Sequence, residues 1–335
     1  MESMKRFLVI NTSFFGDILL TEPLCRNIKR SFPGCSITFI ANKPFADAAR
    51  YGKGVDEVVA YDKKGEHRGI LGALKFYRRY RCRFAGGFDA AFVIYGNERG
   101  IVLAKLFGAK RVYADNKGLI ACLLDNPRHI DYKGRQKVQM KNSALLEFFT
   151  HKPAMNLPMR YVPQQEAYDS LEAKLQHMGL SLADNAVGLC TTSKKLEKDM
   201  PPADCIELIA RLKRTGYMPL LLGAGERARQ YAASLKQSGC TDFADMTDMT
   251  TIPELGALLA QCRALISVDT GTMHLGLSTG TPAVCLFYIS TPQHLAAWAP
   301  EPELYRAQVL TGHITVDEMM HSLDVVSSSD FGRKA

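Results

Sequence analysis

The chain has 335 residues, 47% hydrophobic and 23% charged, which suits two globular domains of about 150 residues each and excludes a disordered or fibrous protein. No apolar run approaches the ~20 residues that span a bilayer, and the first residues do not have the pattern of a signal peptide. The net charge of +8 divides into +12 on residues 1–150 and −4 on residues 151–335, so the first half suits an anionic partner such as nucleic acid, an acidic membrane surface or a phosphorylated lipid.

Short apolar runs alternate with helical patterns through the first half of the chain. Strands are predicted at residues 6–10, 36–41, 55–61, 90–95 and 111–114, and helices at residues 18–32, 43–51, 69–84, 99–107 and 143–149. Strands that alternate with helices form a parallel sheet with helices on both faces. Ligands of such sheets bind beyond the carboxyl ends of the strands, so the loops that follow the strands are the candidate binding loops.

The loop after the first strand carries a glycine and an acid. Gly16 allows close approach of a ligand to the backbone, and Asp17 stands at the start of the predicted helix. Asp17 is therefore a candidate catalytic carboxylate. Its position fits a helix cap equally well.

A strongly basic segment with interleaved aromatic residues follows the third predicted strand. Its cations include Lys63, Lys64, Arg78, Arg79 and Arg81. Three interpretations stay open: a solvated helix face, a surface for the phosphates and acid sugars of a lipid-linked acceptor, and a nucleic-acid surface. No RNA- or DNA-binding motif accompanies these residues, so nucleic acid is the least supported partner.

The second half shows the same alternation after a proline-containing linker near residues 151–163. Strands are predicted at residues 186–190, 218–222, 264–268 and 283–287, and helices at residues 166–178, 204–215, 226–238, 251–262 and 273–279. No strand pattern leads into Asp242 or Asp245. The chain is thus expected to form an N-terminal domain, residues 1–160, and a C-terminal domain, residues 161–335.

One polar loop of the second half is rich in hydroxyls and lysines. Thr191 and Thr192 follow a predicted strand and offer hydroxyl and N–H groups to a phosphate. Lys198 supplies a compact positive charge nearby, and Lys194 or Lys195 could take the same role. The alternative is a solvated lysine loop.

A glycine-rich turn follows the next predicted strand. Gly223 to Ala228 fits the dinucleotide fingerprint G-x-G-x-x-[GA]. The acid that this fingerprint usually has about 20 residues later, at the end of the following strand, has no clear counterpart. The fingerprint is therefore a weak indication of nicotinamide chemistry.

The most informative stretch runs from residue 264 to residue 287 as strand, polar turn, helix and strand. Its turn aims backbone N–H groups and the positive end of a helix dipole at one point, which suits phosphate. The hydroxyls of Thr270 and Thr272 flank Gly271, and His274 places an imidazole beside the same point. Asp269 can accept a hydrogen bond from a ribose or hold the turn. Taken singly, each of these residues also fits a helix cap or an ordinary surface position.

Together these motifs resemble those of the heptosyltransferase family, the inverting glycosyltransferases that extend the lipopolysaccharide core. The matching runs are Gly16-Asp-Ile-Leu-Leu-Thr-Glu-Pro23, Thr191-Thr192 with Lys198-Asp-Met-Pro201, the turn to Glu226, and Asp269-Thr-Gly-Thr-Met-His274 with Gly280-Thr-Pro282. The chain departs from the family pattern at Asn11, where Arg or Lys is common, at Met200, where Trp is usual, and after Phe287.

The resemblance implies the GT-B architecture, two Rossmann-like domains facing a central cleft. It implies that residues 1–160 bind the acceptor and residues 161–335 the donor, with Asp17 as the general base. The implied reaction transfers heptose from ADP-heptose to the lipopolysaccharide inner core with inversion. No D-x-D triplet occurs in the chain, so no metal or other cofactor is implied, and the diphosphate charge falls to Lys198, His274, the threonines and the helix N-terminus.

The resemblance, together with the charge of the basic segment, gives the expected site residues and partners. The expected donor-binding residues are Thr191, Thr192, Lys198, Glu226, Asp269, Thr270, Gly271, Thr272 and His274, and the expected acceptor-binding residues are Gly16, Lys63, Lys64, Arg78, Arg79 and Arg81. In the family, the acid matched by Glu226 contacts the donor's ribose or base. The expected partners are a nucleotide-sugar donor, an anionic lipid-linked saccharide and the inner-membrane surface, but not nucleic acid.

Three other functions stay open. The first is a transferase of the same fold that uses another nucleotide sugar for a cell-surface polysaccharide. The second is a nicotinamide-dependent oxidoreductase that uses the turn Gly223 to Ala228, and the third is a non-catalytic binding protein. The nine scattered cysteines form no C-x-x-C pair, which indicates reduced thiols, no zinc site and a cytoplasmic protein, here expected at the cytoplasmic face of the inner membrane.

Overall fold

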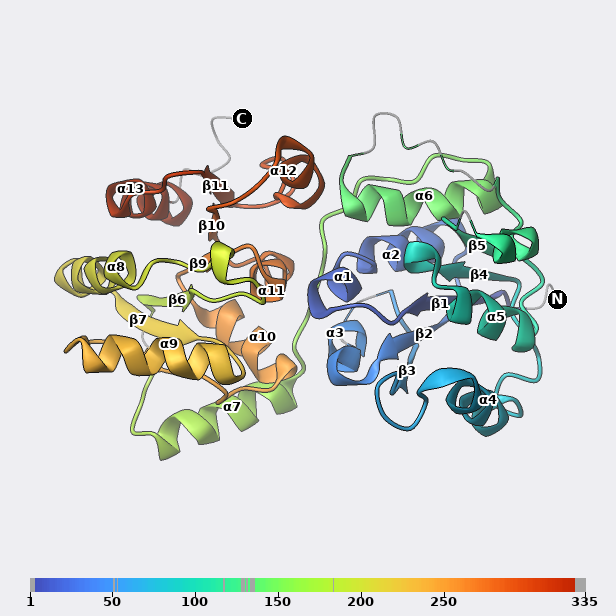
Figure 1. The fold of residues 1–335 in the computed structure, drawn as a ribbon, viewed down its shortest axis with the longest axis horizontal. Helices are drawn as coiled ribbons and strands as arrows, with labels where there is room; N and C mark the ends of the chain where they lie inside the picture. Colours follow the sequence, from blue (N-terminus) through green and yellow to red (C-terminus); the bar gives the residue numbers. More distant parts are fainter. Residues whose placement is uncertain are drawn as a thin grey trace. The chain divides into compact units, whose positions relative to one another are not determined.

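The chain folds into two compact units, an N-terminal unit (Met1–Arg160) and a C-terminal unit (Tyr161–Ala335) (Figure 1). The structure, a computed structural model, describes residues 4–50, 52, 54–116, 118–127, 130, 132, 136–182 and 184–328. The sequence places its domain boundary at the same residue. Each unit is built on a wholly parallel sheet, as the alternation of strands and helices predicts.

In the described part of the N-terminal unit, five strands form one sheet in the order β3-β2-β1-β4-β5. The strands are β1 (Arg6–Asn11), β2 (Ser36–Asn42), β3 (Glu57–Tyr61), β4 (Ala90–Val93) and β5 (Val112–Ala114). The helices are α1 (Phe15–Leu19), α2 (Glu22–Ser31), α3 (Ala46–Arg50), α4 (Gly69–Tyr80), α5 (Glu98–Leu106) and α6 (Val138–Thr150). Short 3-10 turns are η1 (Lys43–Phe45), η2 (Ile94–Gly96) and η3 (Leu119–Leu123).

Alternate residues of β1 supply the cores on the two faces of this sheet. Leu8 and Ile10 belong to the apolar cluster that also contains Phe76 of α4. Phe7 points to the other face, where its ring lies 5.1 Å from that of Phe32 and 5.7 Å from that of Phe149. Each such side chain stabilises the fold by roughly 1.5–3 kcal/mol through its burial. Helices on both faces therefore fix β1, and with it the loop that follows its carboxyl end.

The structure corrects three predicted boundaries in this unit. The single helix expected over residues 18–32 is two helices, because Pro23 lacks an N–H group and starts a new first turn in α2. The basic helix expected over residues 69–84 ends at Tyr80. The helix expected from residue 143 begins five residues earlier, at Val138. Tyr51, the last residue of another expected helix, lies outside the described residues.

In the described part of the C-terminal unit, six parallel strands have the order β11-β10-β9-β6-β7-β8. The strands are β6 (Ala186–Cys190), β7 (Met218–Leu222), β8 (Ala244–Asp245), β9 (Ala264–Val268), β10 (Ala283–Phe287) and β11 (Ala307–Thr311). The helices are α7 (Gln165–His177), α8 (Pro202–Arg214), α9 (Glu226–Gln237), α10 (Ile252–Gln261), α11 (Gly271–Thr279), α12 (Pro292–Trp298) and α13 (Val316–Ser327), and the 3-10 turn η4 covers Leu196–Lys198.

Four predicted strands of this unit match β6, β7, β9 and β10 residue for residue. The prediction was wrong about Asp245, because the two-residue strand β8 pairs with β7 and ends at that residue. A run of two residues is too short to show a periodic pattern. None of the described helices is both long and apolar enough to cross a membrane.

Candidate active site

In the N-terminal sheet, the strands that follow β1 in the chain are added on one side of it as far as β3, and β4 is then added on its other side. The order of the strands therefore reverses between the neighbours β1 and β4. Such a reversal opens a crevice at the carboxyl ends of the two strands, where open α/β sheets bind their ligands. Asp17 comes from the segment after β1 and Tyr95 from the segment after β4. The Tyr95 hydroxyl donates to Oδ1 of Asp17 over 2.7 Å, so the two segments meet at this carboxylate.

The second oxygen of Asp17 is bound within α1. Its Oδ2 accepts from the backbone N–H of Phe14, the residue before the helix, at 3.2 Å. The helix-cap interpretation of Asp17 is therefore confirmed. Capping fixes the rotamer of the carboxylate through Oδ2, while Oδ1 is bound by the tyrosine hydroxyl.

Tyr95 was missed by sequence reasoning, which made it the last residue of a strand. Its backbone has φ 58° and ψ 21°. This is the left-handed region, which residues other than Gly, Asn and Asp seldom adopt. Gly96 is also left-handed, and a Cβ there would lie 1.9 Å from the carbonyl oxygen of Asp115. Burial raises the pKa of Tyr95, and the charge of Asp17 raises it further, so the hydroxyl remains a donor at neutral pH.

Lys63 lies beside the same carboxylate. Its Nζ donates to the carbonyl oxygen of Thr12 at 2.5 Å and lies 5.7 Å from the ring centroid of Phe14. Burial and the neighbouring charge of Lys64 lower its pKa, while the charge of Asp17 opposes that shift. The structure thus brings Gly16, Asp17, Lys63 and Lys64 to one edge of the sheet, as the sequence predicts.

The three arginines expected with them lie elsewhere. Helix α4 leads the chain back from the carboxyl edge of the sheet toward its amino edge, and Arg78, Arg79 and Arg81 lie at the end of α4. The next cation along the chain, Arg83, pairs at 2.6 Å with Glu57, the first residue of β3. The direction of α4 therefore places these three arginines away from Asp17, and their part in acceptor binding stays a prediction.

The C-terminal sheet has its own reversal of strand order, between β6 and β9. Asp269 directly follows β9, and its side chain is almost completely buried. Its Oδ2 accepts from Lys198 and lies 2.7 Å from Nε2 of His294. Burial raises the pKa of Asp269, but the hydrogen bonds from Lys198 and His294 lower it overall, so the carboxylate is ionised at neutral pH.

Lys198 is thus a cation that the fold places next to the turn after β9. It belongs to η4, and its Nζ lies 3.4 Å from Nε2 of His294. Lys195 instead lies 4.0 Å from Glu197 and is exposed. The structure thus shows a contact with Asp269 for Lys198, the lysine to which the sequence assigns the diphosphate.

The threonines differ in what they do. The Thr270 hydroxyl accepts from the backbone N–H of Thr272 at 3.0 Å, so Thr270 caps α11 with Gly271 as its first residue. Thr191 is buried after β6, and its carbonyl oxygen accepts from the backbone N–H of Met200. Thr192 is half-buried beside it. The positive end of α11 and these hydroxyls lie at the carboxyl ends of β9 and β6, as expected.

His274 is more buried than the sequence suggests, with 3% of its surface exposed. Burial lowers its pKa to about 4, against the opposing charge of Asp269, so the imidazole is neutral at pH 7. Its ring lies 6.1 Å from that of Trp298, which lies 6.0 Å from His294. An aromatic layer therefore borders Asp269, and two of its three members, His294 and Trp298, were missed because the sequence shows no matching pattern after Phe287.

Glu226 stands at the carboxyl end of β7 but faces solvent. Its carboxylate accepts from Arg229 at 2.8 Å and from Gln230 at 2.9 Å, and the hydrogen bond from Arg229 is the main cause of its lowered pKa. The acid of the dinucleotide fingerprint would be Asp245, which instead accepts from Lys236 at 2.6 Å. The fingerprint also follows β7 rather than a strand at the reversal of chain order.

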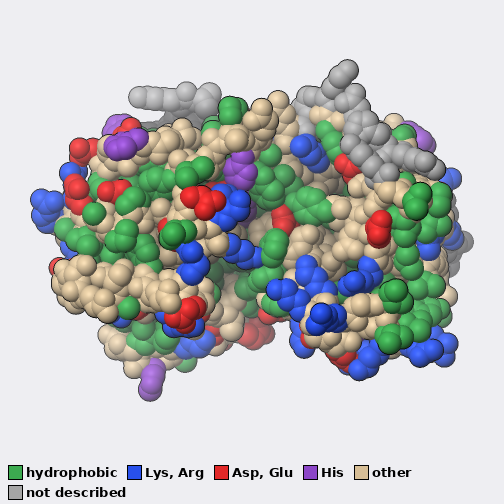
Figure 2. All heavy atoms as spheres, in the orientation of Figure 1, with side chains coloured by type: hydrophobic (Ala, Val, Ile, Leu, Met, Phe, Trp, Pro, Cys, Tyr) green, Lys and Arg blue, Asp and Glu red, His purple; other side chains and the backbone are tan. Residues whose placement is uncertain are grey.

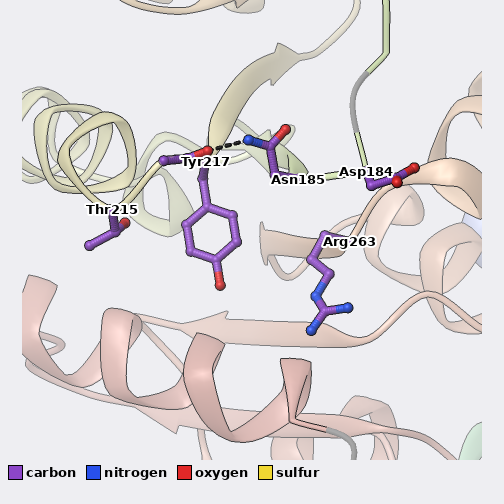
Figure 3. A pocket seen from close by; sticks show the side chains of 6 residues that line it. Asp184, Asn185, Thr215, Tyr217 and Arg263 are labelled. Carbon is purple, nitrogen blue, oxygen red and sulfur yellow. Dashed lines mark hydrogen bonds between the residues drawn. The ribbon is translucent and has the colours of Figure 1, made fainter.

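A cavity of about 460 Å³ lies at the other edge of the same sheet (Figure 3). Asn185, Tyr217 and Arg263, which border it, precede β6, β7 and β9 respectively. This is the amino edge, where sheets of this type do not bind their ligands. Among the described residues, no group of three or more His, Cys, Asp or Glu side chains is arranged to hold a metal ion.

Comparison with known proteins identifies the family. Residues 86–315 match the model of glycosyltransferase family 9 (heptosyltransferase), which is more than half of the chain. The chain belongs to glycosyltransferase family 9. As a family 9 protein it is a glycosyltransferase, and the resemblance noted in its sequence is confirmed. The oxidoreductase interpretation of the glycine-rich turn finds no support.

Named relatives cover nearly the whole of this family 9 chain. Lipopolysaccharide heptosyltransferase 1 of Salmonella typhimurium is 21% identical over 89% of this chain and 96% of its own. The crystal structure of a family 9 glycosyltransferase from Veillonella parvula has a TM-score of 0.85, with 21% identity and 98% of both chains covered. The ADP-heptose lipopolysaccharide heptosyltransferase II of E. coli has a TM-score of 0.77, with 18% identity and 97% and 98% covered. These likenesses confirm the GT-B fold class, with two Rossmann-like domains.

Proposed function

We propose that this family 9 chain transfers heptose from ADP-heptose to a hydroxyl of the lipopolysaccharide inner core, with inversion at the transferred carbon. The proposal rests most directly on Asp17, a carboxylate at the strand-order reversal of the N-terminal unit, oriented by two hydrogen bonds beside Lys63. A hydroxyl nucleophile needs a base, and an acceptor that carries phosphates or acid sugars needs a cation nearby. Named relatives that are lipopolysaccharide heptosyltransferases support the choice of donor and acceptor.

The proposed reaction is a single displacement. Asp17 takes the proton of the acceptor hydroxyl as its oxygen forms a bond to the anomeric carbon of the heptose. The bond from that carbon to the diphosphate breaks, and ADP leaves with the electron pair. Attack from the face opposite the leaving group inverts the configuration. A positioned base contributes about 10²–10⁴ in rate to such a step.

The C-terminal unit is proposed to hold the donor. Lys198, the positive end of α11 and the hydroxyls of Thr270 and Thr272 are assigned to the diphosphate, so the proposal requires no metal or other cofactor. Lys198 exchanges its contact with Asp269 for the phosphate. His274 is neutral and so acts at most as a hydrogen-bonding group. Asp269 and His294 remain to bind hydroxyls of the sugar.

The acceptor side follows from the charge of the N-terminal unit. We assign an anionic, lipid-linked saccharide to Gly16, Asp17, Lys63 and Lys64, at the cytoplasmic face of the inner membrane. Nucleic acid is not part of the proposal. Glu22, the nearest other acid of this segment, is excluded as the base, because its buried carboxylate accepts from Arg26 at 2.6 Å and from the N–H of Arg160 at 3.0 Å.

The test is the variant Asp17→Asn, which keeps the size of the side chain and an oxygen for the hydrogen bond from Tyr95. We expect kcat for heptose transfer to fall by about two orders of magnitude or more, because the base is lost, with ADP affinity unchanged, because the donor is assigned to the other unit. Assays contain EDTA, since the proposal needs no metal.

The matched control is Asp89→Asn, which removes another carboxylate of the same unit. Asp89 accepts from the backbone N–H of Arg6, the first residue of β1, and so lies at the opposite edge of the sheet. This variant should keep its turnover. An Asp17→Asn enzyme with most of its activity would contradict the assignment of the base, and loss of parent activity in EDTA would contradict the metal-free donor site.

A further inference from the structure

Helix α4 carries aliphatic side chains that the core does not use. Ile70 is 87% exposed and Leu71 is 82% exposed, and Leu74 is exposed on the next turn. The helix packs on the sheet through another face, where Phe76 is completely buried between Tyr61 and Phe107. Water is a poor environment for these three side chains, and nothing in the packing of the unit requires them.

The neighbouring elements extend this apolar surface. Helix α5 contacts both α4 and η3. Val102 and Leu106, one turn apart on α5, are exposed, and so is Leu119 of η3, at 97%. We call the combined surface the aliphatic face, and it comprises Ile70, Leu71, Leu74, Val102, Leu106, Leu119 and Leu123. Hydrophobic side chains gather along this side of the N-terminal unit in Figure 2. Adjoining exposed aliphatics indicate an interaction site, whereas single ones do not.

Cations without acidic partners border the aliphatic face. Lys75 and Arg79 pair with Glu66 at 3.0 and 3.5 Å. By contrast, Arg68, Arg78 and Arg81 are exposed and form no ion pair within the part of the chain that the structure describes. These three arginines lie on α4 or directly beside its ends. The helix therefore presents aliphatic side chains and free positive charges to the same surroundings.

We propose that the aliphatic face docks on an anionic lipid bilayer, with α4 lying in the plane of the interface. Amphipathic helices of this kind place Leu and Ile at the boundary of headgroups and acyl chains, and their arginines meet anionic headgroups. The inference rests on the proposed function for its setting, because a lipid-linked acceptor is met at a membrane surface.

A second copy of this chain fits the same surface poorly. A symmetric dimer through this face would bring Arg68, Arg78 and Arg81 of one copy near the same arginines of the other, and like charges repel. A bilayer supplies the negative charge that these arginines lack. Since α4 begins at the carboxyl edge of the sheet, docking also holds the loop of Asp17 and Lys63 next to the membrane surface.

The experiment measures sedimentation of the full chain with vesicles of equal parts phosphatidylcholine and phosphatidylglycerol, with no acceptor or donor present. The parent should pellet with these vesicles, less at high salt and less with phosphatidylcholine alone. The double variant Ile70→Ser with Leu71→Ser should lower the partition coefficient about tenfold or more, because two buried aliphatic side chains are lost. Arg78→Glu with Arg81→Glu should lower it as strongly on the anionic vesicles.

Matched controls use exposed residues away from the aliphatic face. Met155→Ser removes an exposed apolar side chain of the same unit, and Lys213→Glu with Arg214→Glu reverses two exposed cations on α8. Both should bind vesicles like the parent. Failure of the parent to pellet, or unchanged binding by the Ile70 and Leu71 variant, would overturn the proposal. A dimer in solution that this variant dissociates, without vesicle binding, would assign the face to self-association instead.

The outcome is separable from that of the proposed function. Transfer to a water-soluble acceptor fragment and ADP affinity do not depend on the aliphatic face, so the Ile70 and Leu71 variant should keep both. Vesicle binding without any heptose transfer would support the membrane-docking surface and contradict the proposed reaction.

Discussion

At the scale of single residues, the contact between Tyr95 and Asp17 has the clearest chemical consequence. A hydrogen bond to a carboxylate stabilises its charged form and fixes its orientation. Tyr95 reaches Asp17 from a different strand end, 78 residues away in sequence, so each helps to define the position of the other. We therefore regard Tyr95 as a positioning residue for the proposed base.

The variant Tyr95→Phe tests this role. We expect kcat to fall roughly tenfold, since a hydrogen bond to a charged group contributes about 1.5–3 kcal/mol, while ADP affinity stays unchanged. The acidic limb of the kcat–pH profile should move to higher pH, because the carboxylate loses a donor that favours its ionised form. Tyr80→Phe, on α4 of the same unit, is the control. A lower kcat without a shift of that limb would show that Tyr95 only packs.

Sequence reasoning located the residues that directly follow strands and missed those that reach them from afar. Asp17, Lys198 and Asp269 were predicted because each lies in a loop after a recognisable strand. Tyr95 and His294 were missed, because their importance lies in contacts with residues 78 and 25 positions away. Contacts over such separations depend on strand order, which hydrophobic periodicity does not determine.

At the scale of elements, the buried strands of the C-terminal unit were predicted well for a physical reason. The strands β6, β7, β9 and β10 are short, apolar except for Ser267, and bounded by turn residues, so their limits are visible in the sequence. After Phe287, α12 and β11 have mixed composition, and their half-buried faces give no clear period. The split between α1 and α2 could have been predicted from Pro23, which cannot donate within a continuous helix.

Helix α10 shows how one cap connects two elements. Thr251 and Glu254 form a capping box at its start, and Glu254 also accepts from Lys174 at 2.7 Å and Ser170 at 2.6 Å, both on α7. Burial raises the pKa of Glu254, but the hydrogen bonds from Lys174, Ser170 and Thr251 outweigh it and hold the pKa at about 2. The carboxylate is therefore charged, and joins α7 to α10, at any pH above about 2.

We expect Glu254→Gln to lower the free energy of unfolding at pH 7 by about 1–3 kcal/mol. The folded pKa lies below the unfolded value of 4.5, so the parent's advantage is full above pH 4.5 and disappears as the pH falls toward 2. Urea denaturation at pH 7 and pH 3 measures both. Glu318→Gln is the control, because that carboxylate has the same cap contacts with Thr315 but lies in an exposed cap. Equal losses in the two variants would show that the link to α7 contributes nothing.

At the scale of the whole molecule, each unit has its own apolar core and its own strand-order reversal. A ligand that binds one native unit should therefore stabilise that unit more than the other. If the C-terminal unit holds the donor, ADP should stabilise the C-terminal unit more than the N-terminal unit. The assignment of acceptor to residues 1–160 and donor to residues 161–335 is open to direct measurement.

Hydrogen exchange of the full chain should show this separation. ADP should slow exchange in the segments around Thr191 to Lys198 and Asp269 to His274, and leave the segment around Asp17 unchanged. UDP should protect less at the same concentration if the donor is an adenine nucleotide. Lys198→Ala should weaken the ADP effect, because a charge-assisted contact with phosphate is lost. Protection around Asp17 alone would place the nucleotide in the N-terminal unit and contradict the assignment of the donor to the C-terminal unit.

The left-handed backbone of Tyr95 has a consequence for engineering this enzyme. Glycine adopts that conformation freely, whereas a tyrosine there loses roughly 1–3 kcal/mol of stability. Glycine at position 95 would relieve this strain but would also lose the hydrogen bond from the tyrosine hydroxyl to Asp17, which is of similar size. A directed-evolution campaign should therefore hold Tyr95 fixed and seek stability elsewhere.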